Sequence, residues 1–330
     1  FSSVVKGNAY GHGMGLFIPL AESFGIRHFS VFSAEEAFEV RKHRTEESDI
    51  LIMGMIANEQ LEWAIYAGIA FFVFDIDRLH NALRAAQKLG KQARVHIEVE
   101  TGMNRTGFPA RMLQEAIDLV RANPEHLRFE GFCTHFAGAE SIANYYRVRK
   151  QFNNYNKALK RVKAMGLEPE IRHTACSAAS MRYPATQLDL VRIGILQYGF
   201  FPSREVFVDY VSKRKDKEYP LTRLISWKSR VMDVKYVKTG EFVGYGTSYL
   251  ANSDMKIATV PVGYSHGYSR SLSNQGRVLI RGQRLVVVGT VNMNMISVDV
   301  TQVEGVEKGD EVVLIGNQGE NEISVSSFSD

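Results

Sequence analysis

The chain of 330 residues is 45% hydrophobic and 23% charged, a balance typical of proteins that fold around a packed core. Its 40 lysine and arginine residues against 36 aspartate and glutamate residues give a net charge of +4, too small an excess to favour nucleic acid or a membrane surface as a partner. Two cysteines without a CxxC spacing argue against a disulfide framework and a structural zinc site, and favour a reducing, cytoplasmic compartment.

The two ends of the chain carry no targeting pattern. No apolar stretch approaches the length of a membrane span, and no signal peptide is visible. The chain starts at Phe1 inside a strand pattern and ends at Asp330 in mid-pattern. We therefore expect both termini to be incomplete.

The first strand pattern is a short β-branched run that ends at Lys6 and is followed by the small-residue turn 7–13. An unpaired ammonium is costly to bury, so a lysine at a strand end has two interpretations. It is either a Schiff-base lysine that points into a cavity, or a lysine with a buried stem and a solvated ammonium. The local pattern alone favours neither.

From Arg27 onward, strand patterns alternate with helix patterns. The predicted strands are 28–33, 49–55, 70–76, 94–100, 128–136, 171–176 and 189–194. The predicted helices are 34–43, 58–68, 77–90, 109–122 and a long helix with Val148, Phe152, Tyr155, Leu159 and Val162 on one apolar stripe. This alternation predicts a parallel sheet with helical crossovers. With the Lys6 strand there are about eight units, which predicts a closed, TIM-like (β/α)8 barrel.

After Tyr198 the pattern changes. Residues 203–220 are charged and aperiodic, with KRKDK at 213–217, which favours a solvated loop or linker. Strand-like segments separated by glycine turns follow at 224–237, 242–249, 256–264, 277–293, 296–300 and 311–316. The sequence therefore predicts two domains, a (β/α)8 barrel at 1–218 and a smaller, mainly-β domain at 219–330.

Polar side chains follow the predicted barrel strands at or just after their ends. They are Lys6, Arg105, His135, Ser177 and Arg192. The carboxyl ends of the strands carry the chemistry of such barrels, so these five residues predict one site. Glu98, on the polar face of its strand, is a plausible partner for the Arg105 guanidinium; the alternative is an incidental surface salt bridge.

Two further features point to ligands. Ser177 in a small-residue turn and Gly194 on the last barrel strand suit a phosphate, although an ordinary glycine turn explains the pattern as well.

Tyr245 and Tyr264 both follow a VG dipeptide among small residues that leave their rings room to enter a cavity. A single tyrosine is usually a core or interface residue, and the repeated setting weakens that interpretation.

The ordered motifs VVKGNAYGHG, ETGMNRTGF, THFAGAE, RHTACSAA, VRIGI, VGYGTSY, VGYSHGYSR and VGTVNMNM extend over nearly the whole chain. By these motifs the chain resembles the alanine racemase family, pyridoxal-phosphate enzymes of fold type III. The resemblance implies interconversion of L-alanine and D-alanine by two bases, which supplies D-alanine for peptidoglycan. It also implies a homodimer with shared active sites, and an amino acid as the small-molecule substrate.

The resemblance also implies roles for individual residues. Lys6 would hold the cofactor covalently and act as one base, and Tyr245, reaching in from the other subunit, would be the second. The phosphate would be held by Tyr10, Ser177, Gly194 and Ile195. Arg192 would face the pyridine nitrogen, supported by His135 and His173. Arg105 would lie near the cofactor hydroxyl and the substrate carboxylate, and the Met293 backbone N–H of the partner chain would bind that carboxylate. Tyr264 and Arg270 would line the entrance.

The chain departs from the family pattern at several positions. Glu98 stands where many relatives carry a carbamylated lysine, and a carboxylate there would replace the carbamate. Asn292, Asn294, His266 and Cys176 are further departures, and a late phosphate-binding tyrosine would lie beyond Asp330. A racemase of broader specificity, for serine, lysine or other amino acids, is therefore an alternative. A fold-type-III decarboxylase is disfavoured by Arg192 and Tyr245, and a non-catalytic cofactor-binding protein by the β domain.

Overall fold

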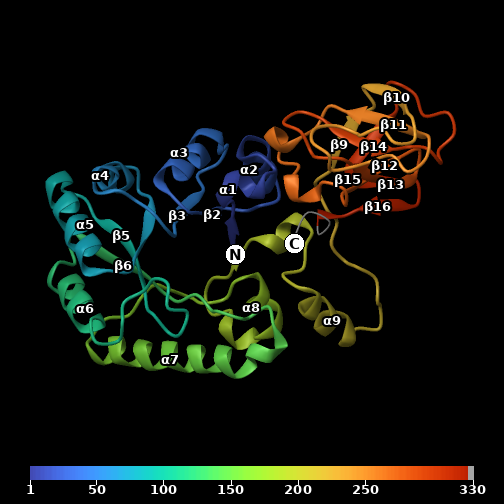
Figure 1. The fold of residues 1–330 in the computed structure, drawn as a ribbon. Helices are drawn as coiled ribbons and strands as arrows, with labels where there is room; N and C mark the ends of the chain where they lie inside the picture. The colour runs from blue at the N-terminus through green and yellow to red at the C-terminus, as the bar shows by residue number, and fades with distance from the viewer. Residues whose placement is uncertain (326–330) are drawn as a thin grey trace. The chain divides into compact units, whose positions relative to one another are not determined.

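The computed structural model describes residues 1–325 and divides into two compact units, Phe1–Leu224 and Ile225–Asp330 (Figure 1). Within residues 1–325, no helix is long and apolar enough to cross a membrane. Each unit has its own apolar core.

The first unit is a parallel barrel. In the described part of the chain, its sheet has eight strands: β1 (Ser2–Val4), β2 (His28–Val31), β3 (Asp49–Ile52), β4 (Ala70–Val73), β5 (Ala93–Glu98), β6 (Leu127–Cys133), β7 (Ile171–His173) and β8 (Arg192–Ile193). They pair in the order β7-β6-β5-β4-β3-β2-β1-β8. A parallel bridge between Cys176 and Arg192, with the Arg192 N–H donating to the Ala175 carbonyl at 3.0 Å, nearly closes the ring. The barrel prediction is confirmed.

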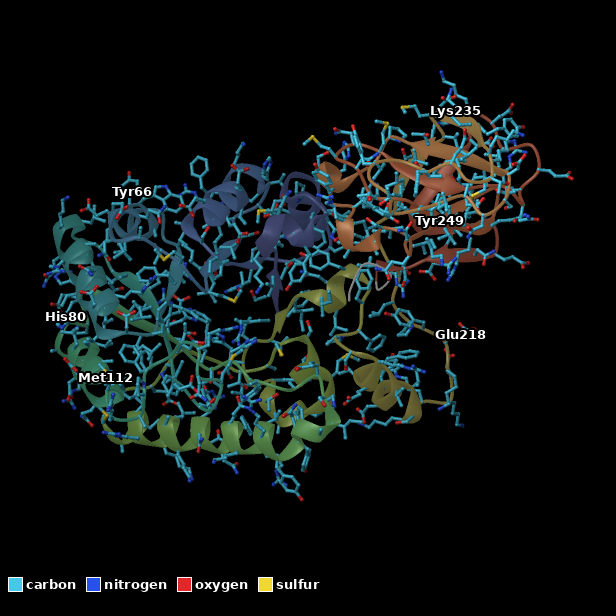
Figure 2. The ribbon with its side chains drawn as sticks, in the orientation of Figure 1. Tyr66, His80, Met112, Glu218, Lys235 and Tyr249 are labelled. Carbon is cyan, nitrogen blue, oxygen red and sulfur yellow. The ribbon has the colours of Figure 1, made fainter. Side chains whose placement is uncertain are left out.

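The helices of this unit are α2 (Met14–Ser23), α3 (Ala34–His43), α4 (Asn58–Tyr66), α5 (Ile76–Leu89), α6 (Leu113–Ala122), α7 (Tyr145–Ala164), α8 (Ser177–Arg182) and α9 (Arg204–Ser212). Helices α3 to α7 follow the strands around the outside of the sheet (Figure 1). Their exposed side chains, such as Tyr66 and His80, point away from it (Figure 2). The predicted stripe of α7 is buried at Val148, Tyr155, Leu159 and Val162 and half-buried at Phe152.

Two sequence predictions in this unit need correction. Helix α6 begins at Leu113 rather than at Pro109. Residues 203–220 are not all loop, because α9 occupies Arg204–Ser212. The Ser203 hydroxyl accepts from the Val206 N–H at 3.2 Å and starts that helix.

The second unit is antiparallel. Its described strands are β9 (Trp227–Arg230), β10 (Asp233–Val237), β11 (Met255–Val260), β12 (Arg277–Ile280), β13 (Gln283–Val288), β14 (Ile296–Asp299), β15 (Glu311–Gln318) and β16 (Asn321–Ile323). They pair in the order β10-β11-β14-β13-β12-β15-β16, and β9 pairs with β15. The predicted strand at 242–249 is wrong. Gly244 and Gly246 have φ of 73° and 69°, which leaves a single bridge between Phe242 and Leu250.

Candidate active site

Lys6 directly follows β1 and precedes an unusual turn. Residues 7–10, inside the segment labelled α1 (Lys6–Tyr10), all have φ between 53° and 62°, so this is a left-handed turn. Each non-glycine residue in that conformation costs about 1–2 kcal/mol. Backbone strain of this kind persists only where the surroundings enforce it, and it concentrates at functional sites.

Glu36 on α3 anchors this turn. Its Oε1 accepts from the Gly7 N–H at 2.6 Å, and its Oε2 accepts from the Phe32 N–H at 2.8 Å. One carboxylate thereby ties the end of β1 to the end of β2. The far end of the turn is held by Asn8, whose Oδ1 accepts from the Met14 N–H at 2.9 Å. Sequence reasoning missed Glu36, since a glutamate in the first turn of a helix is ordinary.

The turn places Tyr10 beside the last barrel strand. A Cβ on Gly194 would lie 2.5 Å from the Tyr10 hydroxyl, so only glycine leaves room for it. The Ser177 hydroxyl accepts from the Gly194 N–H at 3.0 Å. Burial, and then the nearby Cys176 thiol, raise the pKa of Tyr10. The structure therefore brings Tyr10, Ser177 and Gly194 together, and Ile195 follows at the start of a short 3-10 turn.

Arg192 on β8 is only 4% exposed. Its NH1 donates to Nδ1 of His173 and, at 3.1 Å, to the His173 carbonyl. Its NH2 donates to the carbonyls of Thr134 at 2.9 Å and Thr174 at 3.4 Å. A guanidinium has five N–H donors, and among residues 1–325 the Nε–H of Arg192 is the one without a partner.

His135, just after β6, lies near the cations of the site. Burial, with Arg192, Arg105 and Lys6 in that order, lowers the pKa of His135 to about 3. The imidazole is therefore neutral at physiological pH, and the charges of three cationic side chains act on it. Lys6 and Arg105 are themselves exposed to solvent. Such a concentration of positive charge favours an anionic ligand.

Glu98 at the end of β5 is buried, and its Oε2 has no hydrogen-bond partner among the described residues. Burial raises the pKa of its carboxyl, opposed by a hydrogen bond with Thr106 and by the charges of Arg192 and Arg105. The predicted contact between Glu98 and Arg105 does not form as an ion pair within the described residues. Arg105 acts on Glu98 only at a distance, because its own side chain extends into solvent.

A second group of predicted residues lies in the antiparallel unit. The Tyr264 N–H donates to the Asn292 carbonyl at 3.0 Å, and the Ser265 N–H donates to the Met293 carbonyl at 3.0 Å. The guanidinium carbon of Arg270 lies 5.7 Å from the centre of the Tyr264 ring. These contacts bring Tyr264, Arg270 and Met293 together.

Tyr245 lies in the loop between β10 and β11, and its carbonyl accepts from the Thr290 hydroxyl at 3.4 Å. Its side chain is 75% exposed, and that of Met293 is 55% exposed. The predicted site residues thus form two groups, one at the carboxyl ends of the barrel strands and one on loops of the second unit. A parallel barrel with lysine, histidine, serine and arginine at these strand ends defines a barrel enzyme.

The comparisons with known proteins then identify the family. The model of the alanine racemase N-terminal domain matches residues 1–202, and that of the alanine racemase C-terminal domain matches residues 224–330. The chain belongs to the alanine racemase family, which comprises isomerases that depend on pyridoxal phosphate.

Relatives and solved structures agree. Alanine racemase from Symbiobacterium thermophilum is 38% identical over 99% of this chain and 84% of that protein. Alanine racemase from Bacillus anthracis with bound L-Ala-P has a TM-score of 0.88 at 30% identity, over 99% of this chain and 82% of that one. Alanine racemase from Bartonella henselae with covalently bound pyridoxal phosphate has a TM-score of 0.81 at 28% identity, over 96% and 83%.

Proposed function

We propose that this protein interconverts L-alanine and D-alanine, using pyridoxal phosphate held covalently by Lys6. The observation that carries this proposal is the arrangement at one end of the barrel. Lys6 precedes a left-handed turn whose last residue, Tyr10, lies beside Gly194, and the Gly194 N–H donates to the Ser177 hydroxyl. Family membership supports the same reaction.

The residues present fit the cofactor. Tyr10, Ser177 and the backbone at Gly194 and Ile195 would hold its phosphate, and the absence of a side chain at Gly194 is what lets the Tyr10 hydroxyl approach this backbone. The unpartnered Nε–H of Arg192 would donate to the ring nitrogen, and Arg105 would lie near the cofactor hydroxyl and the substrate carboxylate. When bound, pyridoxal phosphate supplies an electron sink that makes the substrate Cα–H acidic.

The chain's own residues would move the proton. Lys6 Nζ and Tyr245 Oη would take and return it on opposite faces of Cα, so that the substrate stays in place. Arg192 does not release its proton, so it would hydrogen-bond the ring nitrogen without protonating it and limit transamination.

We propose a homodimer in which each site is shared, with Tyr245 and Met293 supplied to the barrel of the other copy. Both side chains are exposed in the single chain. The barrel unit also has an exposed apolar stripe along α2 and its C-cap, with Leu16 82%, Leu20 53% and Phe24 80% exposed at four-residue spacing. Exposed apolar stripes of this kind are typical of protein interfaces.

Spectroscopy and a racemisation assay test the proposal. The purified protein should show the visible absorbance of covalently bound pyridoxal phosphate, and Lys6→Ala should remove both this band and racemisation of L-alanine. A protein without the band or the activity would refute the function. Mixing and refolding Lys6→Ala with Tyr245→Phe should restore activity in one of the two sites of the mixed dimer. No recovery would show that each chain builds its site alone.

One observation favours a broader substrate range. Oδ1 of Asn292 is buried without a hydrogen-bond partner among the described residues, directly before Met293. An unsatisfied buried acceptor favours a ligand that brings a donor, such as the serine hydroxyl. Comparison of kcat/KM for L-alanine, L-serine and L-lysine tests this alternative, and strict preference for alanine would exclude it.

A further inference from the structure

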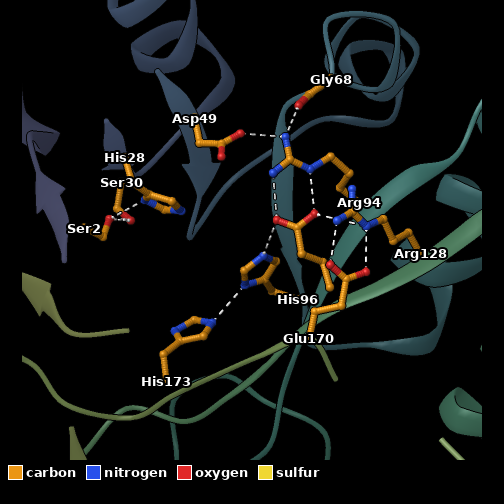
Figure 3. Close-up of polar contacts among 11 residues, drawn as sticks. Ser2, His28, Ser30, Asp49, Gly68, Arg94, His96, Arg128, Glu170 and His173 are labelled. Carbon is orange, nitrogen blue, oxygen red and sulfur yellow. Dashed lines mark hydrogen bonds and ion pairs between the residues drawn. The ribbon is translucent and has the colours of Figure 1, made fainter. Parts of the chain in front are cut away.

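A line of buried polar side chains runs from Arg192 through the barrel interior. Figure 3 shows its part from His173 through His96 to Arg94. Arg192 NH1 contacts Nδ1 of His173, and Nε2 of His173 lies 2.8 Å from Nδ1 of His96 on β5. Nε2 of His96 lies 3.3 Å from Oε1 of Glu130 on β6. Arg94 donates to both oxygens of Glu130, at 2.6 and 2.8 Å. The line therefore links Arg192 in the candidate site to Arg94, which lies at the amino end of β5.

The surroundings keep water out of this line. His96 and His173 are 0% exposed and Glu130 is 2% exposed. The Phe72 ring covers both imidazoles, with centroid separations of 6.3 and 5.8 Å. Gly131 on β6 makes room for His96, since a Cβ there would lie 2.0 Å from Nδ1 of that ring. The protein thus reserves space for this imidazole in a closed interior.

The ionisation states of Glu130, His96 and His173 follow from their burial and from the groups that they contact. Burial by itself would raise the pKa of Glu130, but hydrogen bonds with His96 and Arg94 outweigh it and place the pKa below its usual range. Burial lowers the pKa of both His96 and His173. Glu130 is therefore a carboxylate at neutral pH, and both imidazoles are neutral.

With Glu130 ionised and both imidazoles neutral, only one placement of the imidazole protons satisfies every contact along this line. A carboxylate only accepts, so Nε2 of His96 must carry its proton and Nδ1 of His96 must accept. His173 must then donate from Nε2 and accept at Nδ1, where a guanidinium, which only donates, needs an acceptor. With the opposite tautomer, His173 would turn an N–H toward Arg192.

We propose that Glu130 and His96 are positioning residues that set the tautomer of His173 and thereby hold Arg192 with its Nε–H free. The effect on catalysis rests on the proposed function, in which that N–H meets the ring nitrogen of the cofactor; the tautomers themselves do not. Arg94 keeps Glu130 ionised, and it is braced in turn by Asp49 and the Gly68 carbonyl at 2.9 and 2.7 Å.

Nitrogen-15 NMR of histidine-labelled holoenzyme tests the tautomers directly. Signals assigned with His96→Gln and His173→Gln should show both rings neutral, protonated at Nε2, and unchanged between pH 6 and 8. A proton on Nδ1 of either ring in the wild type would overturn the proposal. This readout requires neither substrate turnover nor a mutation in the observed protein.

Two variants extend the test. Glu130→Gln can turn its amide NH2 toward His96, and Gly131→Ala displaces the His96 ring without a change of charge. For each we expect loss of the uniform Nε2–H tautomers, a shift of the cofactor absorbance, and a fall in kcat of about 10- to 100-fold with little change in KM. The matched control is Glu62→Gln, which breaks the exposed pair with Lys88 at 2.7 Å and should leave all three readouts unchanged.

The outcomes separate the two proposals. If the variants lower only the melting temperature, while the tautomers, absorbance and kcat stay at wild-type values, Glu130 and His96 are merely structural and the inference fails. If the wild-type protein has the Nε2–H tautomers but racemises no amino acid, the proposed function fails and the tautomer assignment stands.

Discussion

Gly7 donates its backbone N–H to Oε1 of Glu36 at 2.6 Å, so that helix α3 holds the left-handed turn that follows Lys6. The two residues are 29 positions apart, and the contact joins the first two βα units of the barrel. It shows that the direction of Lys6 depends on a side chain outside its own motif.

Glu36→Gln should weaken this anchor. Hydrogen bonds to charged groups contribute about 1.5–3 kcal/mol, so the variant should unfold at lower denaturant with a free energy of unfolding reduced by about that amount. Binding of pyridoxal phosphate should weaken as the turn relaxes. Glu35→Gln on the same helix is the control, since Glu35 is exposed and its carboxylate bonds Gln60 on α4 and Ser33. Equal effects of both changes would argue against the anchor.

Gly194→Ala should impair the phosphate end of the site. The new Cβ would lie 2.5 Å from the Tyr10 hydroxyl, and overpacking of this kind costs about 1–3 kcal/mol. Cofactor affinity, measured by titration of the apoprotein, should fall about 10- to 100-fold. Tyr10→Phe removes the clashing oxygen, so the double variant should bind better than the sum of the two single effects predicts. Strict additivity would contradict the contact.

Glu98→Gln should change the dependence of stability on pH. Burial raises the pKa of this carboxyl in the folded protein above that of the unfolded chain. The wild type therefore loses stability as the pH rises through the folded pKa, because the folded state then holds an ionised, buried carboxylate. The amide variant lacks this loss.

We expect urea unfolding to show Glu98→Gln gaining stability relative to the wild type between pH 5 and 8, with the gap closing toward pH 4. The exposed Glu115 on α6 gives a matched control as Glu115→Gln, with no such trend. A gap that widens on acidification would reverse the sign and contradict the assignment.

Phe24→Asp should disrupt the proposed dimer. The side chain is 80% exposed in the single chain, and burial of a carboxylate in an apolar interface costs several kcal/mol, so the dissociation constant should rise about 100-fold or more. Sedimentation should then show monomer, and racemisation should fall with it. Tyr66→Asp on α4, another exposed aromatic position, is the control and should stay dimeric. If Phe24→Asp is still dimeric and active, the stripe of Leu16, Leu20 and Phe24 is not part of the dimer interface.

The barrel and its strand-end residues were predictable because their signals are local. Each βα unit is a contiguous run, so the periodicity of apolar residues shows it, and the residue after each strand is then placed at the carboxyl end. Lys6, His135, Ser177 and Arg192 were placed in this way, and the structure has each of them at or just after a barrel strand. Helix α9 was not predicted because the many charged residues of this segment obscured its apolar side. On that side, Phe207 and Tyr210 pack against Phe201.

The sequence by itself determined the fold class and the motifs that identify the family, since both depend on residue types at fixed short spacings. Only the tertiary structure decided that Glu36 anchors the turn of Lys6, that Glu98 is buried without an ion-pair contact to Arg105, and that Glu130 and His96 stand behind Arg192. These contacts join residues on different strands and helices, and their strength depends on burial and on which charges meet. No local pattern encodes either quantity.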